Sequence, residues 1–143
     1  MAITDFHLLL FEEDASRRAS LVEAAGMAGL ARVIALGTAD EVKDHLHRVA
    51  AGDLPGERLP TLLVTPLDGP PGLDLLAWMN GRPEFRRMVT VGLITPQDGR
   101  LVGRAYDLRI NSCLIRPDDL QGLVELFRSI RQYWERLNQA APS

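Results

Sequence analysis

The sequence contains five short apolar runs in which polar residues do not alternate with apolar ones. Residues 6–11 (FHLLLF) are the clearest example, and residues 61–65 (TLLVT) follow a similar pattern. A strand of this kind must be covered on both faces, which is typical of parallel sheets that lie between helices. The predicted strands are residues 6–11, 32–36, 61–65, 88–94 and 113–115.

Each predicted strand is followed by a segment whose apolar residues recur at helical spacing. Thr38, with Glu41 three residues later, predicts a capping box at the start of the second helix. Gly26 and Gly29 predict the end of the first helix, which begins at Ser16. The further predicted helices are residues 38–50, 73–81, 98–108 and 118–138.

Five strand–helix units in succession predict an α/β fold. Parallel strands joined through helices require right-handed crossovers, and the common strand order for a chain of this size is 2-1-3-4-5. We therefore expect a doubly wound, five-stranded parallel sheet of the flavodoxin-like kind. It forms a single domain over residues 1–143, with its core at about residues 6–138.

Composition argues against several classes of protein. The net charge is −3, and no stripe of Lys or Arg alternates with aromatic residues, so we expect no nucleic-acid partner. No apolar run approaches the roughly 18 residues of a membrane span. No signal peptide is apparent, so a cytoplasmic location is expected. The single cysteine, Cys113, excludes an internal disulfide and a cysteine-based metal cage.

Five local strings keep the order and spacing of one known family. They are residues 8–14 (LLLFEED), 72–76 (GLDLL), 93–95 (LIT), 104–108 (RAYDL) and 111–117 (NSCLIRP). Together they resemble the receiver domains of response regulators in two-component signalling, over about residues 6–138. Residues 130–134 (IRQYW) are similar to the single-domain receivers that are paired with bacterial and cyanobacterial phytochromes.

The resemblance implies a site at the carboxyl ends of the strands. In receivers, a histidine kinase passes a phosphoryl group to an aspartate after the third strand, and Mg²⁺ is held by that aspartate and an acidic pair after the first strand. A hydroxyl after the fourth strand and a lysine after the fifth contact the phosphoryl group. At these positions the chain has Glu12 and Glu13 for the acidic pair, Thr95 for the hydroxyl and Arg116 for the lysine.

The acceptor aspartate of the family is missing from this chain. Alignment through Gly72 without a gap puts Val64 in its slot, whereas alignment by the strand end, with one residue deleted, puts Thr65 there. Neither residue forms an acyl phosphate. Asp68 lies in the same turn as a candidate substitute acceptor, although an aspartate in a turn is also explained by its own backbone hydrogen bonding. The sequence therefore predicts a degenerate receiver, or pseudo-receiver.

The other site positions are altered as well. The family usually has Asp at the Glu13 position, and the extra methylene disfavours octahedral Mg²⁺, so no cofactor is expected and Glu12 and Glu13 are only weak metal candidates. Arg116 presents a planar fork suited to carboxylates, and we hypothesise an ion pair with Glu12 or Glu13. Cys113 stands where many receivers have a switching aromatic, and its expected role is a small apolar filler.

The last three elements form the face through which receivers usually dimerise or meet effectors. Arg104 belongs to this face. Leu126 and Tyr133 are apolar positions off the core stripe of the last helix, and Trp134 adjoins them at the helix end. The charged residues of the face are equally explained by solvation. We predict a homodimer through the last helix, or a complex with a histidine kinase, a phytochrome or a downstream effector.

Three classes of function fit these residues. The favoured one is a phosphorylation-independent protein-interaction module in signalling. The second is an active response regulator in a phosphorelay, with Asp68 or another residue as acceptor. The third is a small-ligand binder of flavodoxin type, which the acidic loop after the first strand disfavours for a phosphate ligand. An enzyme is not expected, because His7, His45 and His47 lie away from the strand-end loops.

Overall fold

The structure is a computed structural model of the 143-residue chain. It describes residues 7–30, 32–56, 59–60, 62–95 and 99–140, with side chains up to Tyr133. The strands in this part of the chain are β1 (His7–Phe11), β2 (Arg32–Leu36), β3 (Leu62–Pro66), β4 (Val89–Ile94) and β5 (Ser112–Ile115). The helices are α1 (Ala15–Met27), α2 (Ala39–Ala50), α3 (Pro70–Asn80), the 3-10 helix η1 (Pro83–Phe85), α4 (Gly99–Asp107) and α5 (Leu120–Ala140).

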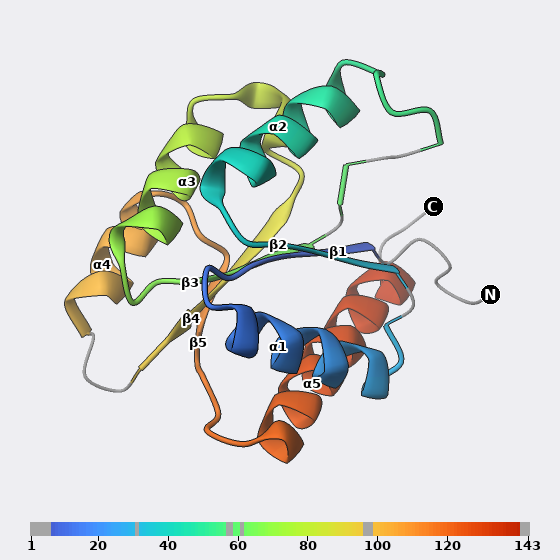
Figure 1. The fold of residues 1–143 in the computed structure, drawn as a ribbon, viewed down its shortest axis with the longest axis vertical. Helices are drawn as coiled ribbons and strands as arrows, with labels where there is room; N and C mark the ends of the chain where they lie inside the picture. Colours follow the sequence, from blue (N-terminus) through green and yellow to red (C-terminus); the bar gives the residue numbers. More distant parts are fainter. Residues whose placement is uncertain (1–6, 31, 57–58, 61, 96–98, 141–143) are drawn as a thin grey trace.

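The five strands form one parallel sheet in the order β2-β1-β3-β4-β5. α1 and α5 cover one face of the sheet, and α2 and α3 cover the other, with α4 beside α3 (Figure 1). The predicted fold class and strand order are confirmed. None of the described helices is both long and apolar enough to cross a membrane.

The continuous apolar run of β1 is explained by burial on both faces. Leu8 and Leu10 pack in the core beneath α1 and α5, while Leu9 and Phe11 pack beneath α2 and α3. Each of these four side chains is at most 1% exposed. The pleat sends successive side chains to opposite faces, so a strand between two helical layers exposes neither face to water and is apolar at most positions.

The helix starts follow local capping chemistry. The Thr38 hydroxyl accepts the backbone N–H of Glu41 at 3.1 Å and donates to the Glu41 carboxylate at 3.0 Å, which confirms a cap at this position. The Glu41 side chain binds this hydroxyl rather than the backbone N–H of Thr38. α3 begins at Pro70, three residues earlier than predicted, because Pro70 and Pro71 occupy first-turn positions where a missing N–H costs nothing.

Three helices end in the same hydrogen-bonded turn, in which one residue takes a left-handed backbone conformation. After α1 and α2 that residue is glycine, namely Gly29 (φ 92°) and Gly52 (φ 78°). After α4 it is Arg109 (φ 65°), and the N–H of Ile110 reaches back to the carbonyl of Ala105 at 3.1 Å. An arginine thus occupies a position where a side chain is unfavourable.

Replacement of Arg109 by glycine is expected to raise the free energy of unfolding by about 0.5–1 kcal/mol, because glycine adopts this conformation without steric cost. Urea denaturation measures the change. Gly52→Ala is the matched control: a Cβ there would have no atom within 4 Å, so its expected loss of about 1 kcal/mol reports the backbone alone. An Arg109→Gly variant less stable than the parent would contradict this account.

Candidate functional site

The carboxyl ends of the strands bring the predicted site residues to one edge of the sheet. Glu12, Glu13 and Asp14 follow β1, Thr95 follows β4 and Arg116 follows β5. Strand-end loops at such an edge are where open α/β sheets place ligand sites. The geometry of this edge therefore decides what chemistry the chain can support.

Arg116 and Glu12 form a buried ion pair across this edge. The distance from Arg116 Nη1 to Glu12 Oε1 is 3.0 Å, and the two side chains are 16% and 5% exposed. The second carboxylate oxygen, Oε2, accepts the backbone N–H of Asp14 at 3.1 Å. Arg116 thus contacts Glu12 and not Glu13, which is exposed. The pair neutralises the one buried carboxylate of the site.

Two neighbouring groups hold the loop after β1 in place. Arg18 donates to the carbonyl oxygens of Glu12 at 2.8 Å and Glu13 at 3.4 Å. Asp14 caps α1, since its carboxylate accepts the backbone N–H of Arg17 at 2.9 Å. That hydrogen bond is the main reason why the pKa of Asp14 lies below its ordinary value. The position of Glu12 is therefore fixed by backbone contacts as well as by Arg116.

The two candidates for the acceptor slot face opposite sides of the sheet. Val64 pairs with Leu10 and Val91, is 1% exposed and packs in the core beneath α1 and α5. Thr65 is fully buried on the other side, and its hydroxyl donates to the Pro66 carbonyl at 3.3 Å. Both lie inside β3, below its end. Neither side chain offers a carboxylate to the edge.

Asp68 is the acidic side chain that follows β3. Its Oδ2 lies 3.5 Å from Arg17 Nη1, and the two side chains are 34% and 55% exposed. An ion pair this exposed contributes little to stability. Asp68 therefore lies at the candidate site in a partly open position, and Arg17, an exposed residue, is its ion-pair partner among the described residues.

Two hollows adjoin at this edge and share Arg17 and Asp68 in their walls. One, of about 360 Å³, lies between α1 and α5, and Thr95, Arg116 and Leu123 contribute to its walls. The other, of about 230 Å³, lies at the β1 and β3 loops, and its lining includes Glu12, Glu13, Asp14, Pro66 and Gly72. Val64 faces the α1–α5 side, so it lies on the same side of the sheet as the larger hollow.

The residues present do not fit the divalent cation that the family resemblance implies. Glu12 is engaged by Arg116 and a backbone N–H, and β3 supplies no carboxylate beside it. In the described part of the chain, no group of three His, Cys, Asp or Glu residues is arranged to hold a metal ion. Both oxygens of the Glu12 carboxylate are thus engaged within the protein.

The remaining site positions are found where the alignment placed them. Thr95 is partly buried in the wall of the larger hollow. Cys113 lies in β5 opposite Gly92 and packs against the cluster beneath α3 and α4. Burial raises the pKa of its thiol, so the thiolate is disfavoured.

The predicted interaction face differs in part from the structure. Leu126 is partly buried and packs against the core beneath α1 and α5, because the apolar stripe of α5 is wider than the one inferred. Tyr133 is 64% exposed and Arg104 is exposed, as expected of surface positions. The side chain of Trp134 lies outside the described residues.

Arg17 and Arg18 are site residues that the sequence reasoning missed. Both lie in the first turn of α1, where the positive end of the helix dipole disfavours a cation. That mismatch was the available signal, since a cation at a helix start needs a local partner. Here the partners are Asp68 and the carbonyl oxygens that follow β1.

Removal of one partner of the buried ion pair should lower the stability of the folded protein. Arg116→Ala is expected to lower the free energy of unfolding by about 3 kcal/mol, because Glu12 stays buried without its cation. Arg17→Ala is the matched control at the exposed pair and should cost less than about 1 kcal/mol. Glu12→Gln added to Arg116→Ala should recover part of the loss. Equal effects of the two alanine variants in chemical denaturation would contradict the assignment.

Comparison with known proteins supports one fold. No family model matches the chain, and no curated protein matches it in sequence. The phosphorylated cyanobacterial phytochrome response regulator RcpA is 22% identical with a TM-score of 0.79, over 98% of this chain and 100% of that one. Response regulator RPA3017, in red light signalling of R. palustris, is 21% identical with a TM-score of 0.75, over 96% and 99%.

A third solved structure extends this likeness. The Mn²⁺-bound form of response regulator Rcp1 is 22% identical with a TM-score of 0.72, over 89% of this chain and 92% of that one. All three matches cover about nine tenths or more of both chains. The chain therefore has the fold of the response-regulator receiver domains, as the sequence resemblance implied.

Proposed function

We propose that this protein is a receiver-fold signalling module that binds its partners without being phosphorylated. The buried ion pair between Arg116 and Glu12 carries the proposal. In the family it resembles, a cation after the fifth strand meets a phosphoryl group and the acidic pair holds a metal. Here the cation and the carboxylate satisfy each other, so the edge has a permanent charge balance that needs neither ligand.

The residues of β3 support the loss of the acceptor. Val64 and Thr65 are both buried in the strand, and neither can form an acyl phosphate. The site has no acceptor aspartate in β3, and Glu12 is paired with Arg116. Phosphoryl transfer to this site is therefore not expected. On this proposal the protein is not an enzyme and requires no metal.

The partner surface is proposed on α4, β5 and α5. Three large apolar or aromatic side chains are exposed on these elements, namely Tyr106 at 51%, Ile115 at 59% and Tyr133 at 64%. Exposed residues of this kind on adjacent elements favour a protein contact. The phytochrome response regulators among the similar structures support a histidine kinase or phytochrome as the class of partner. A second copy of this chain is the other proposed occupant.

A second function is favoured by the position of Asp68. Its partly open carboxylate borders both hollows and forms an ion pair with an exposed arginine. On this alternative the protein is an active response regulator that uses Asp68 as an atypical acceptor. Its distinguishing requirement is that Asp68 gains a phosphoryl group.

Incubation with acetyl phosphate and Mg²⁺ separates the two functions. The proposed function predicts no gain in intact mass, because the edge offers no activated acceptor. A gain that Asp68→Asn abolishes would establish the alternative. Glu84→Gln, at an exposed position of η1, is the control for nonspecific phosphorylation of carboxylates.

A dimer through the last helix should depend on Tyr133. Tyr133→Glu is expected to shift the protein from dimer to monomer in sedimentation equilibrium, because it places a charge in an apolar contact. Ala77→Glu, at an exposed position of α3, is the matched control and should leave the dimer unchanged. A parent protein that stays monomeric at high concentration would contradict the homodimer.

A further inference from the structure

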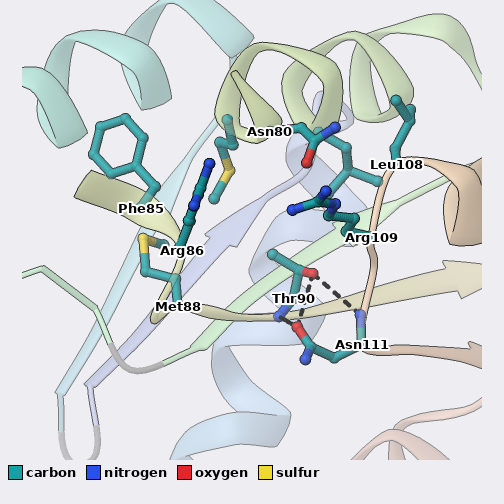
Figure 2. Close-up of a pocket in the computed structure, with 10 residues that line it drawn as sticks. Asn80, Phe85, Arg86, Met88, Thr90, Leu108, Arg109 and Asn111 are labelled. Atoms are coloured by element: carbon teal, nitrogen blue, oxygen red, sulfur yellow. Dashed lines mark hydrogen bonds between the residues drawn. The ribbon is translucent and has the colours of Figure 1, made fainter. Parts of the chain in front are cut away.

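A separate hollow lies at the opposite edge of the sheet, where β4 and β5 begin. It has a volume of about 170 Å³ and lies between the end of α3, η1 and the turn from α4 to β5. Figure 2 shows its labelled side chains, with Thr90 and Asn111 below and Asn80 above. None of the described residues that line the two hollows at the carboxyl-terminal edge contributes to it.

The inner wall of this hollow is apolar. Met79, Phe85 and Met88 are 6%, 2% and 7% exposed, and Leu76 and Leu108 complete the wall. Methionine side chains adapt their shape to what they contact. This part of the hollow therefore favours a hydrocarbon body over a hydrated ion.

The polar groups of Thr90 and Asn111 in this hollow already bind one another. Asn111 Oδ1 accepts the backbone N–H of Thr90 at 2.7 Å and the Thr90 hydroxyl at 3.1 Å. The Thr90 hydroxyl in turn accepts the backbone N–H of Asn111 at 3.3 Å. Figure 2 shows these hydrogen bonds as dashed lines between Thr90 and Asn111. The Thr90 hydroxyl and Asn111 Oδ1 therefore need no ligand as a hydrogen-bond partner.

The remaining polar side chains of the lining are hydrogen-bond donors, and two of them, Arg86 and Arg109, are positively charged. Arg86 and Arg109 lie on either side of the hollow in Figure 2, with the Asn80 amide above Arg109. Neither guanidinium forms an ion pair or a side-chain hydrogen bond with another described residue, and no Asp or Glu belongs to the lining. Two guanidinium groups above an apolar wall complement an anion with an apolar body.

The backbone at Arg109 adds an independent observation. The equivalent turns after α1 and α2 use glycine, whereas Arg109 adopts the left-handed conformation with a full side chain. This conformation is unfavourable for arginine and directs it to the rim of the hollow. The turn itself does not explain why arginine occupies this position, because glycine adopts the left-handed conformation at a lower energetic cost.

We propose that this hollow binds a small organic carboxylate with a single ring or a short branched chain. The carboxylate would lie between Arg86 and Arg109, and the apolar body would lie against Met79, Phe85 and Met88. A cavity of about 150 Å³ accommodates benzene, so a volume of about 170 Å³ suits a body of that size. The proposal is independent of whether the other edge is phosphorylated.

Benzoate is the probe, and titration into the ¹⁵N-labelled full chain is the measurement. Saturable shifts of the Thr90, Arg109 and Asn111 amide resonances are expected. Benzyl alcohol, which keeps the ring but lacks the charge, should bind at least about tenfold more weakly, as expected for loss of a charged hydrogen bond. Inorganic phosphate, which lacks the ring, should also bind at least about tenfold more weakly.

Two variants test the arginines. Arg86→Gln and Arg109→Gly should each weaken benzoate binding about tenfold or more, and glycine suits the backbone of Arg109, so the turn is retained. Arg87→Gln, an exposed neighbour outside the lining, is the control and should bind as the parent does. The amide spectrum of each variant verifies its fold.

Three results would overturn the proposal. The first is benzoate binding that survives both Arg86→Gln and Arg109→Gly. The second is phosphate binding as tight as that of benzoate, which would leave the apolar wall without a role. The third is a set of shifts confined to Arg17, Asp68 and Arg116, which would place the anion at the other edge.

Discussion

A buried ion pair between a carboxylate and a guanidinium organises the edge of this sheet. Glu12 and Arg116 are 104 residues apart in the chain, and β3 and β4 lie between the strands that carry them. Neither charge is tolerable there alone, because an unpaired ion at this depth is destabilising by several kcal/mol. Arg18 donates to the backbone carbonyl of Glu12, and the N–H of Asp14 donates to its carboxylate, so both contacts hold this residue in place. The pair thereby links the end of β1 to the end of β5 across the two strands between them.

The fold was predictable because its signals are local. The doubly buried residues of β1, such as Leu9 and Leu10, require helices on both sides of the sheet, and this requirement can be read without knowledge of distant contacts. Thr38 and Gly29 mark the ends of helices by hydrogen bonds to neighbours a few residues away. Elements that depend on nearby residues alone were therefore placed to within a few positions.

The features that escaped prediction depend on contacts between distant segments. The sequence left Val64 and Thr65 as alternatives because only the pairing of β3 with β1 and β4 sets which face each occupies. Arg131, on α5, donates to the carbonyl of Ala28 at 3.1 Å and so caps α1 from a distant part of the chain. The hollow at the start of β4 and β5 gathers residues from three separate stretches, which no single window of sequence contains.

Gly72 lets the start of α3 contact the end of β3 directly, and α3 extends from there to the opposite edge of the sheet. A Cβ at this residue would collide with the carbonyl oxygen of Pro66, so the first turn of α3 rests directly on the end of β3. The helix has 11 residues and spans about 16 Å, and its last turn, with Met79 and Asn80, forms part of the opposite hollow. A shift of α3 along its own axis would alter both ends at once.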